Sequence, residues 1–389
     1  MSSRLAIVAT HPIQYHAPWF RALATRPELE IKVFFAQLPD PAAQGVGFGE
    51  AFRWDVPLLD GYPSEVVPNA RARPRLGGFF ASSTPGIGER IRAFRPMAVL
   101  LTGWNQLPLL QALRASERMG IPRLVRGESN VLKRRGRLVS ALHRRLLRRY
   151  DVFLTIGSAN AAFYSANGVA AERQVRCPYF VDNERFAAQA AELAAVRSAL
   201  RDGWSVPSGA FCAAFAGKLV PKKRPADLVE AAAMARNQGV EVHVLVAGAG
   251  ELEAALRERA AALGVPVTFA GFLNQSEIAR AYVACDALVL PSDHGETWGL
   301  VVNEAMACAR PAIVSDRVGC AEDLVRDGVT GFSHACGDTA ALAGRLAAMA
   351  SDPSRTTDMG RRAQRLVIEE FSIARACDAV IEALAVARV

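Results

Sequence analysis

Two glutamates with seven residues between them stand in the stretch PSDHGETWGLVVNEAMACARP, residues 291–311. The apolar run at residues 287–290 is typical of a buried strand, and a helix is expected to begin near Gly299. On one helix Glu296 and Glu304 would lie about 12 Å apart, from eight steps of about 1.5 Å. This distance is wider than the roughly 5–9.5 Å between the paired acids of a glycoside hydrolase. We therefore expect the two glutamates to hold different parts of one long ligand.

The backbone between these glutamates has the features of an anion-binding site. Gly299, Leu300 and Val301 fall in the first turn of the expected helix, so their amides have no partner within that helix. Free N–H groups and the positive end of the helix dipole favour an anion such as a phosphate. The arrangement suits a ligand that carries a diphosphate in its middle and hydroxyls at both ends.

The stretch resembles the Glu-x7-Glu signature of the family-4 retaining glycosyltransferases, with a Pro-Ser strand end, a Glu, a Gly-Leu, and a second Glu before Ala-Met. The run SDRVGCAEDLVRDGVTGF at residues 315–332 is also similar to that family, and the strong resemblance covers residues 211–332. Members of the family use nucleotide-sugar donors on a two-domain GT-B fold. The alternative is a strand–loop–helix unit of an unrelated α/β protein, in which Glu304 is a solvated helix residue.

The resemblance implies a role for each of these groups. Glu304 would bind the ribose hydroxyls, residues 299–301 the diphosphate, and Glu296 the sugar ring. Lys218 and Lys223, which follow a strand expected at residues 211–215, match the pair of cations that clamps the diphosphate in relatives. Fixed cations stabilise the negative charge that the leaving nucleotide gains in the transition state. A basic surface turn is the alternative for the two lysines.

Further donor contacts follow from the same resemblance. Lys218 stands where relatives usually have arginine, so the charge is kept while bidentate binding is lost. Phe272, at the end of a strand expected at residues 267–273, resembles the residue that contacts the base. Ala309 stands where relatives usually have glycine, and a left-handed backbone there costs alanine roughly 1 kcal/mol. The expected donor-binding residues are Gln14, Gly217, Phe272, Thr297, Trp298, Gly299, Leu300, Val301 and Glu304.

The first half of the chain opens with a strand–helix–strand pattern, typical of a doubly wound sheet whose ligands bind at the carboxyl ends of the strands. The loop HPIQYHAP after the first strand lacks the glycine pair of many relatives. Gln14 and Tyr15 are expected to bind hydroxyls there, unless the loop is only a capped turn. Arg126 and Glu128 end a later strand where relatives often carry histidine. They are expected beside the reacting sugar, with a surface ion pair as the alternative.

Residues 133–149, KRRGRLVSALHRRLLRR, combine eight Lys and Arg residues with apolar residues at helical spacing. A basic amphipathic helix of this kind can lie on an anionic membrane surface. The alternative is a helix packed on the sheet through Leu138, Leu142, Leu146 and Leu147, with a solvated charged face. Both interpretations remain open from the sequence.

Composition limits the class of protein. The chain has 389 residues, enough for two domains, and its 51% hydrophobic and 22% charged residues are typical of an ordered globular protein. The net charge of +8 comes without interleaved aromatics or a nucleic-acid motif, so no nucleic acid partner is expected. Seven cysteines without CxxC or His spacing indicate reduced core residues, not a disulfide framework or a zinc site.

The resemblance implies an α/β fold of GT-B architecture, with two Rossmann-like domains facing across a cleft. Residues 1–183 would form the acceptor-side domain and residues 205–371 the nucleotide-sugar domain. A helix at residues 372–389 would cross back to the first domain, and residues 202–209 read as a linker. The sequence GAGELE at residues 248–253 lacks the third glycine of GxGxxG, so NAD binding is rejected.

The function predicted from the sequence is a retaining glycosyltransferase of bacterial cell-surface polysaccharide or glycoconjugate synthesis. By resemblance it would move a sugar from a UDP- or GDP-sugar to a saccharide or lipid-linked acceptor. The donor phosphate would accept the acceptor's proton, and no cofactor or metal would be required. A cytoplasmic location is expected, with a peripheral position at the inner membrane face through residues 133–149. The alternatives are a nucleotide-sugar 2-epimerase of similar fold and a non-catalytic binding protein.

Overall fold

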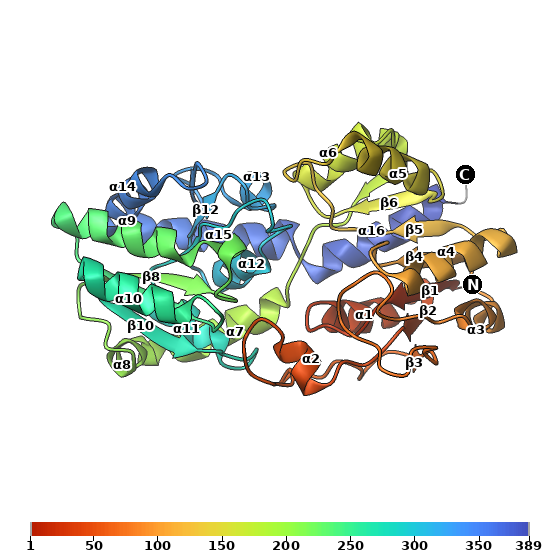
Figure 1. Ribbon diagram of the computed structural model, residues 1–389, viewed down its shortest axis with the longest axis horizontal. Helices are drawn as coiled ribbons and strands as arrows, with labels where there is room; N and C mark the ends of the chain where they lie inside the picture. The colour runs from red at the N-terminus through yellow and green to blue at the C-terminus, as the bar shows by residue number, and fades with distance from the viewer. Residues whose placement is uncertain (1, 388–389) are drawn as a thin grey trace. The chain divides into compact units, whose positions relative to one another are not determined.

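The computed structural model describes residues 2–387, and the chain forms two compact units. The first unit takes in the chain up to Gln44, then Ala51–Tyr179 and the segment that begins at Ile373. The second unit consists of Gly45–Glu50 and Phe180–Ser372. Each unit is a Rossmann-like α/β domain with its own parallel sheet (Figure 1), as predicted.

The first unit is organised around strands in the order β3-β2-β1-β4-β5-β6-β7. The strands are β1 (Ser3–Ala9), β2 (Leu29–Phe35), β3 (Ser64–Val66), β4 (Ala98–Leu101), β5 (Arg123–Val125), β6 (Val152–Thr155) and β7 (Gln174–Arg176). Between them come α1 (His16–Ala24), α2 (Pro41–Gly45), α3 (Ile87–Phe94), α4 (Leu107–Met119), α5 (Arg137–Leu147), α6 (Ser158–Ala166) and the 3₁₀ turn η1 (Ala171–Arg173). The strands β4 and β6 are buried throughout, because helices cover both faces of a parallel sheet.

The second unit repeats the pattern with strands in the order β10-β9-β8-β11-β12-β13. They are β8 (Phe211–Ala216), β9 (Val242–Ala247), β10 (Val267–Gly271), β11 (Ala287–Leu290), β12 (Ala312–Ser315) and β13 (Gly331–His334). The helices are α7 (Asn183–Leu193), α8 (Arg197–Gly203), α9 (Pro225–Asn237), α10 (Glu253–Leu263), α11 (Ile278–Ala284), α12 (Leu300–Ala307), α13 (Ala321–Leu324), α14 (Thr339–Ala350) and α15 (Pro353–Glu370), with 3₁₀ turns η2 (Ala194–Val196) and η3 (Pro221–Lys223).

Helices cover both faces of the second sheet. On one face α9 packs against α10 and α14, and Figure 1 shows these three helices grouped together. Their apolar side chains form a buried core with Phe211, Val244 and Val289 of the strands. On the other face α11 packs against α7 and α8, and α12 packs against α7 and α15. The loops that follow the strands are therefore held at the edge of a rigid layer, where side chains can be positioned accurately.

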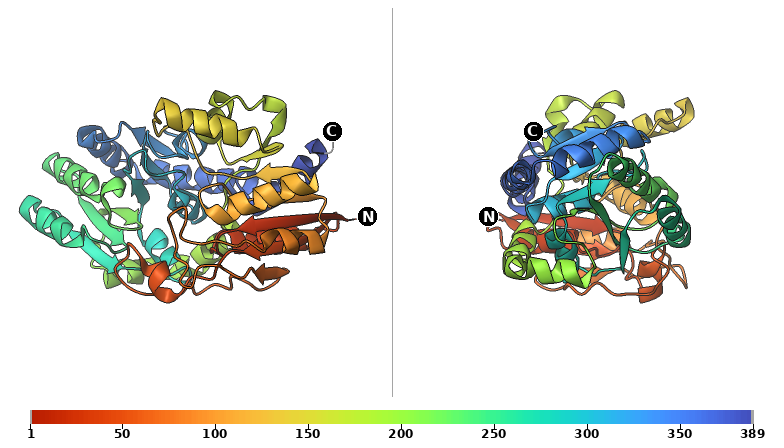
Figure 2. Two further views of the ribbon diagram at one scale, coloured as in Figure 1. Left: turned by 45° about the vertical axis from the view of Figure 1, so that its right-hand side comes forward. Right: turned by 90° about the vertical axis from the view of Figure 1, so that its left-hand side faces the viewer.

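The helix α16 (Ile373–Val386) belongs to the first unit, although it follows the whole second unit in the chain. It packs against α1, β6 and β7 (Figure 2). Its apolar side chains Ala376, Val380 and Ala383 are fully buried. The helix therefore completes the core of the first unit.

The start of α15 at Pro353 follows from a cap, because the Asp352 carboxylate accepts a hydrogen bond from the Arg355 amide and proline is well suited to a first turn. The predicted linker at residues 202–209 overlaps α8, and both α7 and α8 are part of the second unit.

Candidate active site

The carboxyl edge of the second sheet brings together the loops after β8 and β11. Lys223 lies in η3, in the loop after β8, and Glu296 lies in the loop between β11 and α12. The two side chains form an ion pair, and each is only 13% exposed. A largely buried pair of this kind is screened little by salt. The predicted cation and carboxylate therefore meet at one place, although 73 positions separate them in the sequence.

The loop that carries Lys223 is fastened to the loop that carries Glu296. The amide of Asp293 donates to the carbonyl of Lys222 at 2.8 Å, and the Lys222 ammonium donates to the carbonyl of Gly295 at 3.2 Å. These bonds fix the two loops to each other. Lys222 thus holds the two loops together, whereas its neighbour Lys223 forms the ion pair with Glu296.

Lys218 lies in the same loop and contacts the segment Gly45–Glu50, which belongs to the second unit. Its ammonium donates a hydrogen bond to the carbonyl of Val46 and lies 4.9 Å from the centre of the Phe48 ring. Burial, and then the charges of Lys222 and Lys223, lower the pKa of Lys218. Crowded cations of this kind attract an anion, because each one lowers the cost of bringing negative charge to the loop.

The first turn of α12 provides unpaired backbone donors near this loop. Among residues 2–387, the amides of Gly299, Leu300 and Val301 donate no hydrogen bond. Gly299 has a φ of 101°, and a Cβ there would come within 2.8 Å of Leu290. Glycine is therefore required at the point where the chain turns from the loop into the helix. The unpaired amides lie where the sequence predicts an anion site, which stays a prediction.

Glu304 lies inside α12 and is 2% exposed. Its carboxylate accepts hydrogen bonds from the Tyr282 hydroxyl at 2.6 Å and from the Gln275 amide at 3.4 Å. These two bonds, from different segments of the chain, fix the orientation of the carboxylate. Glu304 is thus held in place by neighbours that the sequence did not reveal.

Two other predicted donor contacts differ in exposure. Trp298 is 2% exposed, donates from its indole to the Asn303 side chain at 2.8 Å, and packs against Phe371. Its ring is a core group, so only its backbone could face a ligand. Thr297, the preceding residue, is exposed.

Phe272 and Phe48 form an aromatic contact in the second unit. The rings of Phe272 and Phe48 meet edge to face, with centres 4.7 Å apart. A cavity of about 570 Å³ lies next to Phe48, lined also by Val220, Gly250 and Glu251. Gly217 stands at the start of this loop with a φ of 130°. The cavity is within the size range of small-molecule sites, and the carboxylate of Glu253 also lines it.

The first unit holds a separate buried cluster around Arg126. This residue is 2% exposed, and its guanidinium lies 4.4 Å from the Tyr179 ring centre and 5.3 Å from the Trp19 ring centre. It also contacts His16, and burial, followed by the charge of Arg126, holds the pKa of His16 well below its usual range. Arg126 is therefore enclosed by rings and does not form the surface ion pair that was the alternative.

Glu128 and Gln14 lie closer to the surface of the first unit, and both are partly exposed. Glu128 accepts a hydrogen bond from the Tyr179 hydroxyl. Tyr179 therefore links the buried guanidinium of Arg126 to the accessible carboxylate of Glu128. His11, in the same loop as Gln14, bonds to the Thr10 hydroxyl at 2.9 Å.

Within residues 2–387, no group of three His, Cys, Asp or Glu side chains is placed to hold a metal ion. Over the same range, no helix has both the length and the apolar character that crossing a bilayer requires.

Comparisons with known proteins show what the chain is similar to. Residues 196–366 match the family model described as glycosyl transferases group 1. The matched stretch contains Lys218, Lys223, Glu296 and Glu304. This part of the chain is therefore similar to the group 1 glycosyl transferases.

Two curated relatives carry related names. The D-inositol 3-phosphate glycosyltransferase of Arthrobacter sp. (strain FB24) is 35% identical over 178 residues, which are 43% of this chain and 41% of that protein. The chain thus matches less than half of that relative's length. The GDP-mannose-dependent alpha-(1-6)-phosphatidylinositol dimannoside mannosyltransferase of Mycobacterium tuberculosis (strain ATCC 25177 / H37Ra) is 27% identical over 329 residues, 81% of this chain and 80% of that protein.

The solved structure of Anabaena HepE in complex with UDP superposes with a TM-score of 0.74 at 20% identity, covering 99% of this chain and 100% of that one. At this identity the likeness shows the fold alone, and it confirms the two Rossmann-like domains of the GT-B kind.

Sequence reasoning missed the groups that hold the predicted residues in place. Phe48, Tyr282 and Gln275 contact Phe272 or Glu304, yet they belong to other segments of the chain. Phe48 had a local signal, because it stands in GVGFGE, where glycines are dense around a single aromatic residue. Tyr282 had none, since an apolar helix residue with a hydroxyl is common in cores.

Proposed function

We propose that this protein is a family-4 retaining glycosyltransferase that uses a UDP- or GDP-sugar donor. Its acceptor is a saccharide or a lipid-linked saccharide of bacterial cell-surface polysaccharide or glycoconjugate synthesis. The observation that carries the proposal is the meeting of Lys218, the Lys223–Glu296 pair and the unpaired amides of α12 at one edge of the matched domain. The names of the two relatives and the UDP bound to the structural neighbour support it.

Each group has a stated task in the proposed reaction. Lys218, Lys223 and the α12 amides hold the diphosphate and stabilise the charge that it gains as the bond to the sugar breaks. Glu304 accepts hydrogen bonds from the ribose hydroxyls, and Phe272 contacts the base. Glu296 orients the sugar ring and is itself oriented by Lys223.

In the first unit, Glu128 and Gln14 contact the acceptor or the reacting sugar, and Arg126 positions Glu128 through Tyr179. The acceptor attacks on the face that the leaving group departs from, and the donor phosphate takes its proton. This step keeps the anomeric configuration and needs no protein nucleophile.

The first experiment measures thermal shifts and calorimetric binding with UDP-, GDP- and dTDP-sugars. The preferred donor is then incubated with candidate saccharide and lipid-linked acceptors, and the anomeric configuration of the product is read by NMR. We expect acceptor-dependent transfer with retention. Donor conversion without an acceptor would instead identify an epimerase, and binding without conversion a non-catalytic protein.

We further propose that the enzyme is cytoplasmic and that α5 attaches it to the anionic inner face of the membrane. A lipid-linked acceptor would be found on that face. The helix projects from its unit in the right-hand view of Figure 2. Leu147 is buried, but Leu138 is 83% and Leu142 is 67% exposed. The interpretation in which all four leucines pack on the sheet therefore does not account for the helix.

The charges on α5 and directly beside it agree with this proposal. Exposed cations flank the exposed leucines, and among residues 2–387 they have no carboxylate partner: Arg134, Arg137, Arg144, Arg145 and Arg148. Each basic residue near an anionic bilayer contributes about 1 kcal/mol, screened by salt. Leucines that enter the interface add apolar burial to this attraction.

Co-sedimentation with vesicles tests the attachment. We expect binding to vesicles that contain phosphatidylglycerol, weaker binding at high salt, and none to phosphatidylcholine alone. Arg144→Gln/Arg145→Gln and Leu138→Gln/Leu142→Gln should each weaken it, whereas Arg362→Gln/Arg365→Gln, which removes the same charge from exposed positions of α15, should not. Equal losses of vesicle binding in the two arginine variants would show that only the net charge of the protein matters. This result would contradict a role for α5.

A further inference from the structure

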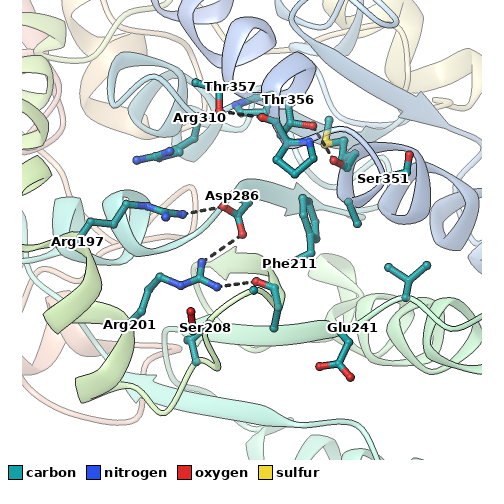
Figure 3. Close-up of a pocket in the computed structure, with 18 of the residues that line it drawn as sticks. Arg197, Arg201, Ser208, Phe211, Glu241, Asp286, Arg310, Ser351, Thr356 and Thr357 are labelled. Carbon is teal, nitrogen blue, oxygen red and sulfur yellow. Dashed lines mark hydrogen bonds and ion pairs between the residues drawn. The ribbon is translucent and has the colours of Figure 1, made fainter.

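A cavity of about 890 Å³ lies at the amino edge of the second sheet (Figure 3). Its lining includes the residues at which strands begin, namely Phe211 of β8, Glu241 before β9, Asp286 before β11 and Pro311 before β12. The candidate active site uses the loops at the other, carboxyl edge of the same sheet. The cavity is therefore distinct from the proposed donor site and has no role in the proposed reaction.

Three arginines line this cavity, two from α8 and one from the turn after α12. Figure 3 shows Arg197 and Arg201 reaching toward Asp286. The Asp286 carboxylate pairs with them at 2.6 and 3.2 Å and also accepts the Cys212 amide at 2.8 Å. Arg310 has no carboxylate partner among residues 2–387. One carboxylate thus balances three guanidinium groups in this part of the cavity.

The arginines also cap the carboxyl end of α11. Arg310 donates from Nε to the carbonyl of Tyr282 at 2.9 Å and from one terminal nitrogen, Nη2, to that of Val283 at 3.1 Å. Arg197 donates from Nε to the Val283 carbonyl at 2.9 Å and from Nη2 to the carbonyl of Cys285 at 3.3 Å. Cations at a helix carboxyl end complement its dipole, so part of each side chain has a structural task.

This structural task uses only one edge of each of two guanidinium groups. The Nη1 nitrogens of Arg197 and Arg310 donate no hydrogen bond within residues 2–387. Burial lowers the pKa of Arg310, and the charge of Arg197 acts in the same direction. Two mutually repelling cations with unused donors form a place where an anion is stabilised.

Other groups bear on the size and charge of a ligand. The exposed carboxylates of Asp202 and Glu241 also line the cavity, and Figure 3 shows Glu241 at the end away from Arg310. An anionic group would therefore lie beside Arg310 and Arg197. The hydroxyls of Ser198 and Ser208, which make no hydrogen bond within the described range, are available to a polar ligand. The volume falls within the roughly 300–1,000 Å³ of small-molecule sites.

We propose that this amino-edge cavity binds a phosphate-bearing small molecule of sugar-phosphate or nucleotide size, with Arg197 and Arg310 as its phosphate ligands. The planar fork of a guanidinium matches the geometry of phosphate oxygens, and two forks from different elements fix its orientation. The ligand is separate from the donor, since it occupies the opposite edge of the sheet.

The test uses the full chain with Lys218→Ala/Lys223→Ala, which removes the lysines proposed to bind phosphates at the active site. Calorimetry with inorganic pyrophosphate and glucose 6-phosphate should show saturable binding in this background, and glucose should show none. Arg310→Gln should weaken the binding of the phosphate probes at least 10-fold.

A second variant keeps the test decisive if Arg310→Gln does not fold. Ser208→Glu adds a carboxylate to the cavity lining without altering any arginine, and it should weaken the same probes about 10-fold or more. Ala262→Glu, which adds the same charge to an exposed position of α10, should leave the affinity unchanged. Absence of saturable binding at millimolar probe concentration would overturn the proposal. Equal affinity in Ser208→Glu and its background would do so as well.

Discussion

At the scale of single residues, the three lysines of the loop after β8 have different surroundings. Lys223 pairs with Glu296, Lys218 lies over Phe48, and Lys222 donates to a backbone carbonyl. The resemblance singles out Lys218 and Lys223 for the diphosphate, and the proposed function keeps this assignment. Lys222 has the contact that joins its loop to the loop of Glu296.

The lysines give the first prediction. In Lys218→Ala and Lys223→Ala the turnover number should fall by about 10²-fold or more, the size of effect found when an electrostatic stabiliser is removed. The affinity for the donor should change less, because the lysines act on charge that develops in the transition state. Steady-state kinetics with saturating donor measures both. The matched variant Lys222→Ala should keep near-normal turnover, and a loss there as large as in Lys223→Ala would contradict the assignment.

His11 gives a prediction about pH. Burial lowers the pKa of its imidazole to about 4, against about 6.5 in an unfolded chain. The unfolded state therefore binds the proton first, and the stability that His11 gives above pH 6.5 is lost as the pH falls towards 4. At pH 4.5 the difference corresponds to about 2.5 kcal/mol, at about 1.4 kcal/mol per pKa unit.

Denaturant unfolding at pH 7 and pH 4.5 measures this effect. We expect the loss of unfolding free energy between the two values to be about 2 kcal/mol smaller in His11→Asn than in the unchanged protein. The exposed His294→Asn serves as a control and should lose as much as the unchanged protein. If His11→Asn and the unchanged protein lost stability in parallel, the neutral imidazole would have no role in acid sensitivity.

At the scale of elements, α12 ends with a strained residue. Ala309 has a φ of 56°, in the left-handed region, and the amides of Ala309 and Arg310 bond back to the carbonyls of Met306 and Ala305. Glycine at this position would avoid the Cβ clash. The backbone cannot easily change, because Gly360 of α15 packs directly on the Ala309 carbonyl.

Ala309→Gly should therefore stabilise the protein by up to about 1 kcal/mol, the cost of a left-handed alanine. For a unit of this size, 1 kcal/mol corresponds to a rise of roughly 2–4 °C in melting temperature. Calorimetry of the variant measures it. Ala261→Gly, at an exposed position inside α10, should have the opposite effect, since glycine costs about 1 kcal/mol in a helix interior. A lower melting temperature for Ala309→Gly would refute this account of the helix end.

At the scale of the whole molecule, the sequence predicted the features that depend on local patterns, such as apolar runs followed by polar loops. The strands expected at residues 211–215 and 287–290 could be predicted from their apolar runs, and Lys223 and Glu296 lie in the loops that follow them. The ion pair between these two side chains was not predicted. The contact of Lys218 with Val46 could not be predicted, since 172 positions separate them and no periodicity links them. Burial was also hard to predict: Arg126 and Trp298 are enclosed, while Leu138 is exposed, and only tertiary packing decides such cases.

The first unit contains segments from both sides of the second unit in the sequence, and this order decides which unit can be completed first during synthesis. The second unit is finished once Ser372 has left the ribosome, whereas the first still lacks α16. Until that helix arrives, the apolar surface that Ala376, Val380 and Ala383 will cover stays open to solvent. Nascent chains at this stage expose a surface of the kind that chaperones bind. The half of the protein that is translated first is thus the last to mature.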